Sequence, residues 1–324
     1  MIKRKAAVIG CGGAGSQHAG GYVKLPGVEF VGAADIDLSK AEALTAQTGG
    51  RAYASYEELI AAEKPDFVSV CTREYDHEQP ALFALEHGCH VLSEKLMAHS
   101  LDAGRAMLNT ARKHNRLLGV NYNYRFIDSI RLLKEKLDSG VIGEIKTASF
   151  QVHAYCHHHA LDLIRYLFGD MDGLNATLTE IDSERHYPWN LAHEMLYIPS
   201  YNEATVLRAG KTLVTLTASH RSFAFPLMEV EVTGAKGRIL IRDMNVDSIN
   251  GEMRVQLENQ DERFLPGPLT LEHTFHRSID NWVKRLNGLE TDSASGEDGL
   301  QALLLESAIA RSNRERSDVN LRSE

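Results

Sequence analysis

The sequence predicts an α/β protein in which a doubly wound parallel sheet is followed by a domain of antiparallel strands. Three observations support this prediction. Short apolar runs alternate with amphipathic segments over the first 120 residues, and a glycine-rich turn follows the first of these runs. Long stretches of alternating apolar and polar residues lie further along the chain, at 204–219 and 227–241.

The short apolar runs of the first part predict buried parallel strands. They are rich in β-branched residues, end near Gly, Pro or Asp, and are separated by segments with helical periodicity. This alternation favours a sheet covered by helices on both faces. Strands are expected at 6–10, 29–35, 66–72, 89–94 and 117–122, and helices at 77–88 and 101–115.

The pattern changes after residue 122. A chain of 324 residues is long enough for two domains, each with its own core. We therefore expect residues 1–122 to form the first domain and residues 123–324 the second. In the second part, helices are expected at 127–140, 270–287 and 297–312, and antiparallel strands within 204–219 and 227–241.

Composition limits the classes of partner. Hydrophobic residues make up 43% and charged residues 24%, as in globular proteins. The net charge of −9 argues against nucleic acid or an acidic membrane as partner. The four cysteines lack CxxC spacing, which suits a reducing cytoplasm. The apolar run after the basic start is too short for a signal peptide, and no run approaches a membrane span. We expect a cytoplasmic protein without nucleic-acid or membrane partners.

The segment GCGGAG at 10–15 indicates a dinucleotide site. It places Gly10, Gly12 and Gly15 in a G-x-G-x-x-G pattern, with Gly13 and Ala14 between them, after an expected strand and before a helix. The glycines permit a tight turn and close approach of a pyrophosphate, which the helix N-terminus can hold. Such a pattern alone can be a simple glycine-rich turn.

The acidic residues after the second expected strand strengthen this interpretation. Asp35 lies twenty residues after the glycine turn, where its carboxylate would accept hydrogen bonds from the adenosine ribose. Asp35 and Asp37 would repel a 2′-phosphate, and no arginine follows to bind one. We therefore expect NAD as cofactor in preference to NADP.

Several segments of the sequence, taken together in their order, resemble the glucose–fructose oxidoreductase and inositol dehydrogenase family, often written Gfo/Idh/MocA. The resemblance covers nearly the full length of the chain. The resemblance implies a Rossmann domain, then an α+β domain whose open-faced, mainly antiparallel sheet carries the substrate site. It also implies a homodimer or homotetramer assembled through the open sheet face. In order, the matching pieces are GCGGAGSQH, CTREYDH (71–77), HVLSEK, NYNYRF (121–126), GVIGEI (140–145), HALDLIRYLFG (159–169), VTGAKGRI (232–239) and SGEDGLQAL (295–303).

The resemblance assigns Lys95 to the lysine of the family's Glu-Lys-Pro motif, between nicotinamide and substrate. An ammonium group there can hydrogen-bond the reacting hydroxyl and stabilise negative charge on its oxygen, although a solvated surface lysine is the structural alternative. Leu96 stands where the family has Pro. His77 is expected near the cofactor but could equally pack at a helix start. The other expected cofactor contacts in this group are Thr72, Glu94 and Asn123.

The segment HAYCHHHALD at 153–162 contains four histidines and a cysteine. The resemblance makes His159 the counterpart of a catalytic histidine that is followed, three residues later, by an Asp, here Asp162. We expect His159 to accept the hydroxyl proton, because imidazole titrates near neutral pH. Tyr155 stands where the family commonly has Asp and could supply a hydrogen bond or a proton relay.

A zinc site is the alternative interpretation of this segment. Among His153, Cys156 and the three histidines that follow, pairs at i, i+3 and i, i+4 spacing could bind a metal. However, the expected helix begins within the cluster, so its members should point in several directions, and no motif elsewhere completes a tetrad. We therefore expect no metal and place His157 and His158 in the wall of the substrate pocket or at the start of a helix.

Weaker substrate candidates lie elsewhere in the chain. Arg125, near the change of pattern, could contact substrate or form a salt bridge between the domains, and aromatic faces suit a sugar ring or a subunit interface. These candidates are Asn123, Arg125, Tyr187, Trp189, His220 and Arg221.

Taken together, these features predict an NAD-dependent oxidoreductase acting on a secondary alcohol of a sugar, cyclitol or related polyol. One alternative is a glycoside-cleaving lyase or hydrolase that oxidises the sugar ring transiently. Another is a non-catalytic NAD-binding sensor. A dehydrogenase accumulates NADH with its substrate, whereas the lyase turns over without net NADH.

Overall fold

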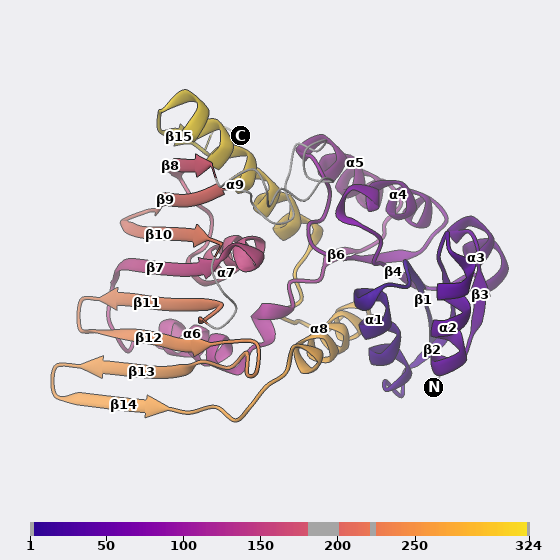
Figure 1. Cartoon of the computed structure of the whole chain (residues 1–324), viewed down its shortest axis with the longest axis horizontal. Helices are drawn as coiled ribbons and strands as arrows, with labels where there is room; N and C mark the ends of the chain where they lie inside the picture. The colour runs from indigo at the N-terminus through magenta and orange to yellow at the C-terminus, as the bar shows by residue number, and fades with distance from the viewer. Residues whose placement is uncertain (1–2, 181–200, 221–224, 323–324) are drawn as a thin grey trace. The chain divides into compact units, whose positions relative to one another are not determined.

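A computed structural model describes residues 3–180, 201–220 and 225–322 (Figure 1). The chain forms two compact units. The first consists of Met1–Asn123 and Phe275–Leu303, and the second of Tyr124–Thr274 and Leu304–Glu324. A division into 1–122 and 123–324 stays a prediction, to which the structure adds that residues 275–303 pack with the first unit.

The first unit is built on a six-stranded parallel sheet in the order β3-β2-β1-β4-β5-β6. Its apolar strands are buried, as expected where helices cover both faces; all four residues of β4 are buried. The strand order reverses between β1 and β4, the position where doubly wound sheets bind ligands. The strands are β1 (Arg4–Ile9), β2 (Val28–Ala34), β3 (Arg51–Tyr53), β4 (Phe67–Val70), β5 (His90–Ser93) and β6 (Leu118–Val120).

Local signals in the sequence set the ends of the helices. In α5, the side chain of Ser100 accepts a hydrogen bond from the backbone N–H of Ala103, and two basic residues lie in the last turn. Ser55 caps α3 in the same way. The helices in the order of the chain are α1 (Gly13–Val23), α2 (Leu38–Thr48), α3 (Tyr56–Glu63), α4 (Glu78–Glu86), α5 (Leu101–Lys113), α6 (Asp128–Asp138), α7 (His157–Phe168), α8 (Leu271–Leu286) and α9 (Gly296–Glu315).

Helix α8 completes the core of the first unit. Ile279 and Trp282 are fully buried within the same apolar cluster as β1 and β4. The fit is close, because a Cβ atom added to Gly119 of β6 would lie 2.6 Å from the indole ring of Trp282. A glycine at this strand position therefore lets the tryptophan pack against the sheet.

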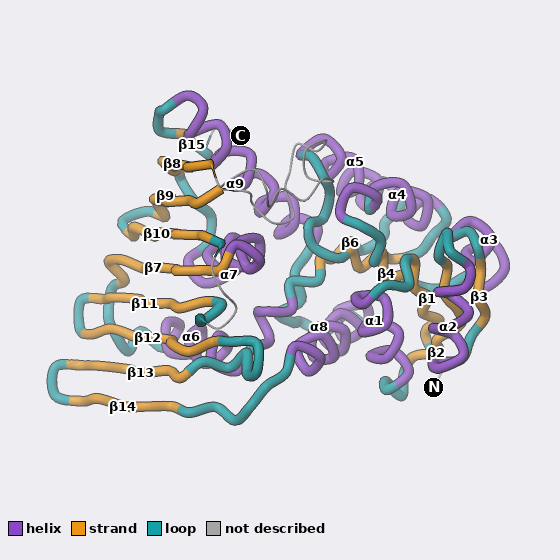
Figure 2. Tube along the Cα trace, in the orientation of Figure 1, coloured by secondary structure: helices purple, strands orange, loops and turns teal. Residues whose placement is uncertain are grey.

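The second unit is built on a nine-stranded, mainly antiparallel sheet, which confirms the predicted fold class (Figure 2). Among the strands that the structure describes in this sheet, only β7 and β10 pair in parallel. In order across the sheet, the strands are β14 (Gln260–Phe264), β13 (Glu252–Leu257), β12 (Gly237–Met244), β11 (Met228–Gly234), β7 (Ile145–His153), β10 (Thr212–Ser219), β9 (Tyr201–Ala209), β8 (Gly173–Glu180) and β15 (Val319–Asn320).

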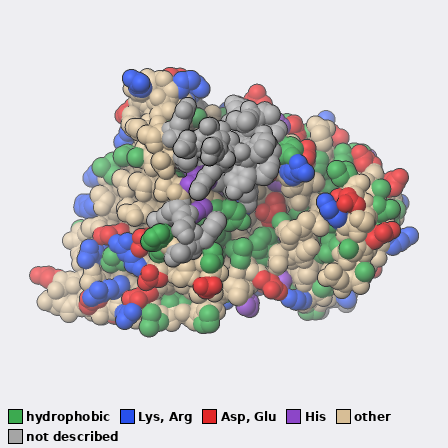
Figure 3. All heavy atoms as spheres, in the orientation of Figure 1, with side chains coloured by type: hydrophobic (Ala, Val, Ile, Leu, Met, Phe, Trp, Pro, Cys, Tyr) green, Lys and Arg blue, Asp and Glu red, His purple; other side chains and the backbone are tan. Residues whose placement is uncertain are grey.

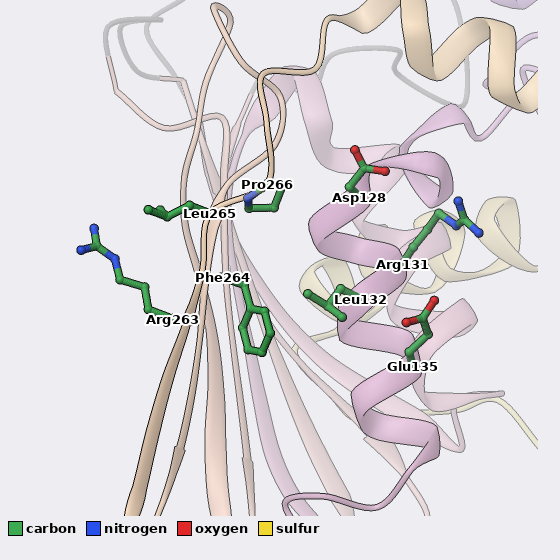
Figure 4. Close-up of a pocket in the computed structure, with 8 residues that line it drawn as sticks. All are labelled: Asp128, Arg131, Leu132, Glu135, Arg263, Phe264, Leu265 and Pro266. Carbon is green, nitrogen blue, oxygen red and sulfur yellow. The ribbon is translucent and has the colours of Figure 1, made fainter.

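The two faces of this sheet differ in burial. Along β10, Val214 and Leu216 are buried, whereas Leu213 before them and Thr215 between them are exposed. Helices α6 and α7 contact β13 and β7, and Figure 4 shows α6 on one side of the sheet. One face is therefore covered and the other open, which explains the alternation that predicted these strands.

Charged side chains of both signs are interspersed over the region of β11 to β14 (Figure 3). Several form cross-strand pairs, such as Arg254 with Asp261 at 2.5 Å and Arg242 with Glu229 at 3.0 Å. Exposed pairs of this kind contribute little to stability but keep strands soluble and in register. Among the helices that the structure describes, none has the length and apolar content needed to span a bilayer.

The packing of α8 predicts a large loss of stability on truncation. Trp282→Ala should lower the free energy of unfolding by about 3–5 kcal/mol, because it leaves a cavity beside β6. Leu289→Ala, at a side chain that is 58% exposed, is the control and should change it by less than about 0.5 kcal/mol. Urea unfolding followed by circular dichroism measures both variants. Equal effects of the two substitutions would show that α8 does not contribute to the core.

Candidate active site

The glycine turn after β1 requires glycine at two positions. Gly10 has φ of +92°, and a Cβ atom there would lie 2.6 Å from the backbone of Cys71. A Cβ atom on Gly15 would lie 2.0 Å from the carbonyl oxygen of Gly10, so α1 packs directly on the turn. These two glycines therefore serve the local fold.

Gly12 and Gly13 have a different environment. A Cβ atom added to either would meet nothing within 4 Å, so open space lies beside the start of α1. Gly12 occupies the N-cap position without a side-chain cap, and the first turn contains no acidic residue. The uncapped N–H groups at this helix end fit the phosphates of a dinucleotide. Ala14 packs at the edge of the apolar core.

Backbone hydrogen bonds orient Asp35 beside this turn. Its Oδ2 atom accepts from the N–H of Cys11 at 2.8 Å, and its Oδ1 atom accepts from the N–H of Asp37 at 2.9 Å. The Asp37 side chain caps α2 by accepting from the N–H of Ser39, and hydrogen bonds from Ser39 lower the pKa of Asp37. The Asp35 carboxylate thus lies next to the turn, as a ribose-binding acid requires.

The next residue, Ile36, was not among the cofactor contacts predicted from the sequence. Its side chain is 99% exposed, although an apolar residue after a buried strand is ordinarily expected inside. A single apolar residue carries no signal that separates a ligand contact from a core position. Its exposure next to Asp35 is visible only in the structure.

His77 connects the loop after β4 with the segment after β5. The ring is buried; Nδ1 lies 2.7 Å from the carbonyl oxygen of Leu96 and Nε2 lies 3.2 Å from that of Thr72. Burial lowers the pKa of His77, which favours the neutral ring. The hydroxyl of Thr72 donates to the carbonyl of Asp76. These contacts favour the packing interpretation of His77.

The residues after β5 contain a buried carboxylate. Glu94 Oε1 accepts from the amide of Asn121 at 2.6 Å and lies 2.9 Å from His18 Nε2. Burial by itself raises the pKa of Glu94, but the hydrogen bond and charge of His18, the charge of Lys95 and the hydrogen bond from Asn121 together hold the pKa below its usual value. Lys95 follows directly and is partly exposed, and the Lys95–Leu96 peptide bond is cis.

This carboxylate belongs to a larger buried network. His18 Nδ1 lies 2.7 Å from the hydroxyl of Ser69, and Ser278 donates to Asn121 at 2.6 Å. The network joins α1, β4, α8 and the ends of β5 and β6. Sequence reasoning missed His18 and Asn121, because the contacts depend on strands that meet only in the folded sheet.

The strand order brings the candidate residues of the first unit to one edge. β2, β1, β4 and β5 are neighbours, all parallel. Asp35 follows β2, Gly10 follows β1, Thr72 follows β4 and Lys95 follows β5. Because parallel strands end at the same edge, these four positions line the carboxyl ends of adjacent strands.

The histidine segment lies in the second unit. A short 3₁₀ turn at Ala154–Cys156 leads into α7, and His159 in its first turn stacks on Tyr124 with ring centres 3.8 Å apart. The His159 side chain is buried. Tyr155 is partly buried, and its backbone N–H donates to His153 Nδ1 at 3.0 Å. His153 therefore acts here as a local cap.

Arg125 and Asp162 pair with each other. Arg125 Nε and Nη2 donate to the two carboxylate oxygens of Asp162 at 2.8 and 2.5 Å, and both residues are buried. The guanidinium also lies over the ring of Tyr166, 4.8 Å from its centre. This pair is a salt bridge within the second unit, not the one between domains that was the alternative for Arg125, and it gives both charges a structural partner.

His157 lies between two buried carboxylates. Its Nε2 atom is 2.7 Å from Glu203 Oε2, and its Nδ1 atom is 3.2 Å from Glu306 Oε2. Burial disfavours the charged imidazole, but the two carboxylates outweigh burial and raise the pKa of His157 to about 10. Neither glutamate was expected from the sequence, because β9 and α9 lie far from the histidines along the chain.

The remaining candidates are less informative. Asn123 is buried at the start of a 3₁₀ turn, Asn123–Phe126, and His220 lies with its ring centre 6.0 Å from that of His153. Tyr187, Trp189 and Arg221 lie outside the described residues. A surface hollow between α6 and the end of β14 contains none of the expected site residues (Figure 4).

Comparison with known proteins agrees with this arrangement. A family model described as an oxidoreductase family with an NAD-binding Rossmann fold matches residues 4–122. A second model, for the C-terminal alpha/beta domain of the same family, matches residues 153–321.

Individual relatives include two dehydrogenases that are named for carbohydrates. D-glucoside 3-dehydrogenase of Escherichia coli is 34% identical over 154 residues, which are 47% of this chain and 44% of that enzyme. D-apiose dehydrogenase of Paraburkholderia graminis is 26% identical over 99% of this chain and 91% of its own length. An oxidoreductase from Agrobacterium radiobacter, solved with NAD⁺, L-tartaric acid and magnesium, has a TM-score of 0.85, 21% identity and 99% coverage of both chains.

The two family models together match most of the chain, and the chain belongs to the Gfo/Idh/MocA oxidoreductase family.

Proposed function

We propose that this protein is an NAD-dependent enzyme that oxidises or reduces a secondary alcohol of a sugar, cyclitol or related polyol. The observation that carries this proposal is the gathering of Gly10, Asp35 and Lys95 after β1, β2 and β5, at the carboxyl edge of one parallel sheet. The names of the glucoside and apiose dehydrogenases support a carbohydrate or polyol substrate.

The cofactor site is built from the residues after β1 and β2. The N–H groups at the start of α1 would hold the phosphates above Gly12, and Asp35 would accept hydrogen bonds from the ribose hydroxyls. Ile36, exposed beside Asp35, would pack on the adenine ring. NAD, when bound, accepts or returns the hydride equivalent.

Lys95 and His159 are proposed to handle the reacting hydroxyl. Lys95 would donate a hydrogen bond to its oxygen and stabilise the negative charge that develops there. The buried network around Glu94 would position the backbone that carries this lysine. His159 would accept the proton, with its ring orientation fixed by stacking on Tyr124. Tyr155 remains a candidate for a relay.

Assembly and location are also proposed. The open face of the nine-stranded sheet exposes Val206 and Leu213 on neighbouring strands, at 39% and 45% of their surface, which supports a homodimer or homotetramer formed through this face. All four cysteines are buried thiols without a disulfide, which supports a cytoplasmic location.

Cofactor preference follows from Asp35. The unaltered protein should bind NAD more tightly than NADP, because the carboxylate repels a 2′-phosphate. Asp35→Ser should reduce the preference for NAD, expressed as the dissociation constant of NADP divided by that of NAD, by about fivefold to a thousandfold. This is the range for one close like-charge contact. Asp102→Ser, at an exposed acid on α5, should leave it unchanged. Calorimetric titration with both dinucleotides measures the ratio, and tighter NADP binding by the unaltered protein would overturn the prediction.

Catalysis can be tested by a screen of sugars and polyols that follows the absorbance of NADH. With an active substrate, His159→Ala should lower turnover roughly 10²- to 10⁴-fold, the usual effect of losing a general base. Lys95→Ala should have an effect of similar size with little change in NAD affinity, since the phosphates bind at the glycine turn. His87→Ala, an exposed histidine on the surface, is the matched control and should keep full activity.

Two results of this screen would contradict the proposal. Consumption of a glycoside without net NADH would identify the redox-neutral cleavage enzyme. Full turnover by His159→Ala would remove this residue from the mechanism.

A further inference from the structure

A cluster of buried side chains in the second unit takes no part in the hydroxyl chemistry of the proposed function. His157, His158 and Glu306 are buried and come from α7 and α9. One donor atom from each residue lies within 4.8 Å of the other two. All three residues belong to the second unit.

We propose that His157, His158 and Glu306 bind one divalent transition-metal ion of the zinc type. Imidazole nitrogens and a carboxylate oxygen form one of the donor sets that zinc uses in proteins. This proposal replaces the expectation of no metal, which was based on the absence of a motif elsewhere in the sequence that would complete a tetrad.

Two of the donor separations lie close to those around a tetrahedral ion. Donors about 2.0–2.2 Å from one ion lie roughly 3.3–3.6 Å apart in tetrahedral geometry. Glu306 Oε2 lies 3.2 Å from His157 Nδ1 and 3.8 Å from His158 Nδ1.

The orientation of the two rings also fits. Two imidazoles bound to one tetrahedral ion have ring centres about 5 Å apart. The rings of His157 and His158 have centres 5.2 Å apart and an interplanar angle of 83°. This ring arrangement is compatible with two imidazoles bound to one ion.

Glu203 supplies the second feature of a metal site. A metal-bound histidine ordinarily directs its other ring nitrogen at a carboxylate, which fixes the tautomer. Glu203 Oε2 lies 2.7 Å from His157 Nε2, and its Oε1 atom accepts from the hydroxyl of Thr205 at 2.6 Å. Glu203, the His157 ring and the ion would thus form a carboxylate–histidine–metal triad.

A metal-free ion triad explains the same residues less well. A protonated His157 between Glu203 and Glu306 is the metal-free alternative. Its single positive charge offsets only one of the two buried negative charges, whereas a divalent ion bound by neutral imidazoles would offset both. His159 directly follows the donors, so the ion would hold the first turn of α7.

Metal content tests this proposal. Protein without a histidine tag is dialysed against zinc chloride, desalted and analysed by mass spectrometry for metals. We expect about one zinc per chain, a higher unfolding midpoint with zinc, and a tetrahedral cobalt spectrum after exchange for Co²⁺. Absence of bound zinc and of the cobalt spectrum in the unaltered protein would overturn the proposal, even if every variant failed to fold.

Variants separate the donors from their neighbours. His158→Gln and Glu306→Gln should each abolish the binding of one zinc per chain. Glu203→Gln should still bind one zinc, with an affinity about 10- to 100-fold lower. His153→Ala is the matched control from the same segment and should bind zinc like the unaltered protein. Equal zinc loss in His153→Ala and His158→Gln would show that this donor set is wrong. Since the readout is zinc content, this result is independent of the dehydrogenase screen.

Discussion

Parallel pairing of β2, β1, β4 and β5 is the constraint on which the first unit depends. Because parallel strands end at one edge, residues distant in sequence must meet there, and their loops can hold a ligand without further adjustment. Gly10 and Gly15 bring α1 against this edge through contacts that no side chain could make. Gly12 leaves the space beside the helix start open. Gly10 and Gly15 thus serve the local fold, whereas Gly12 is proposed to face the phosphates.

Buried charges define the polar interior of both units. In the first, Glu94 is ionised because His18 and Asn121 offset the cost of removing a carboxylate from water. In the second, Asp162 is paired with Arg125, and His157 lies between two carboxylates. Such groups tolerate little rearrangement, since an unpaired buried charge is costly. They therefore hold the segments that carry Lys95 and His159 in defined positions.

Sequence reasoning succeeded where the signal is local. The glycine spacing, the strand–helix alternation and the strand ahead of Asp35 all follow from short-range periodicity, and the family resemblance agreed with them. The partners of the buried charges could not be predicted in this way. Arg125 and Asp162 are 37 residues apart, and Glu306 reaches the histidines from a helix near the end of the chain. The packing of Trp282 on β6 depends equally on tertiary contact.

The histidine segment shows the same limit. Helical spacing suggested donors at i, i+3 and i, i+4, yet His153 caps a turn and His159 stacks on Tyr124. The close contacts instead involve the consecutive residues His157 and His158, with a carboxylate from another element. Within this one segment, His159 is the proposed proton acceptor, whereas His157 and His158 are proposed metal ligands.

NAD binding to a Gly12→Val variant tests the central claim, that the edge beside α1 holds the dinucleotide, most directly. The added side chain meets no protein atom within 4 Å of its Cβ, so the free energy of unfolding should change by no more than about 1 kcal/mol. The same side chain would occupy the space of the phosphates, and calorimetry should show NAD affinity reduced by at least about tenfold. A stable variant that binds NAD as tightly as the unaltered protein would contradict this account.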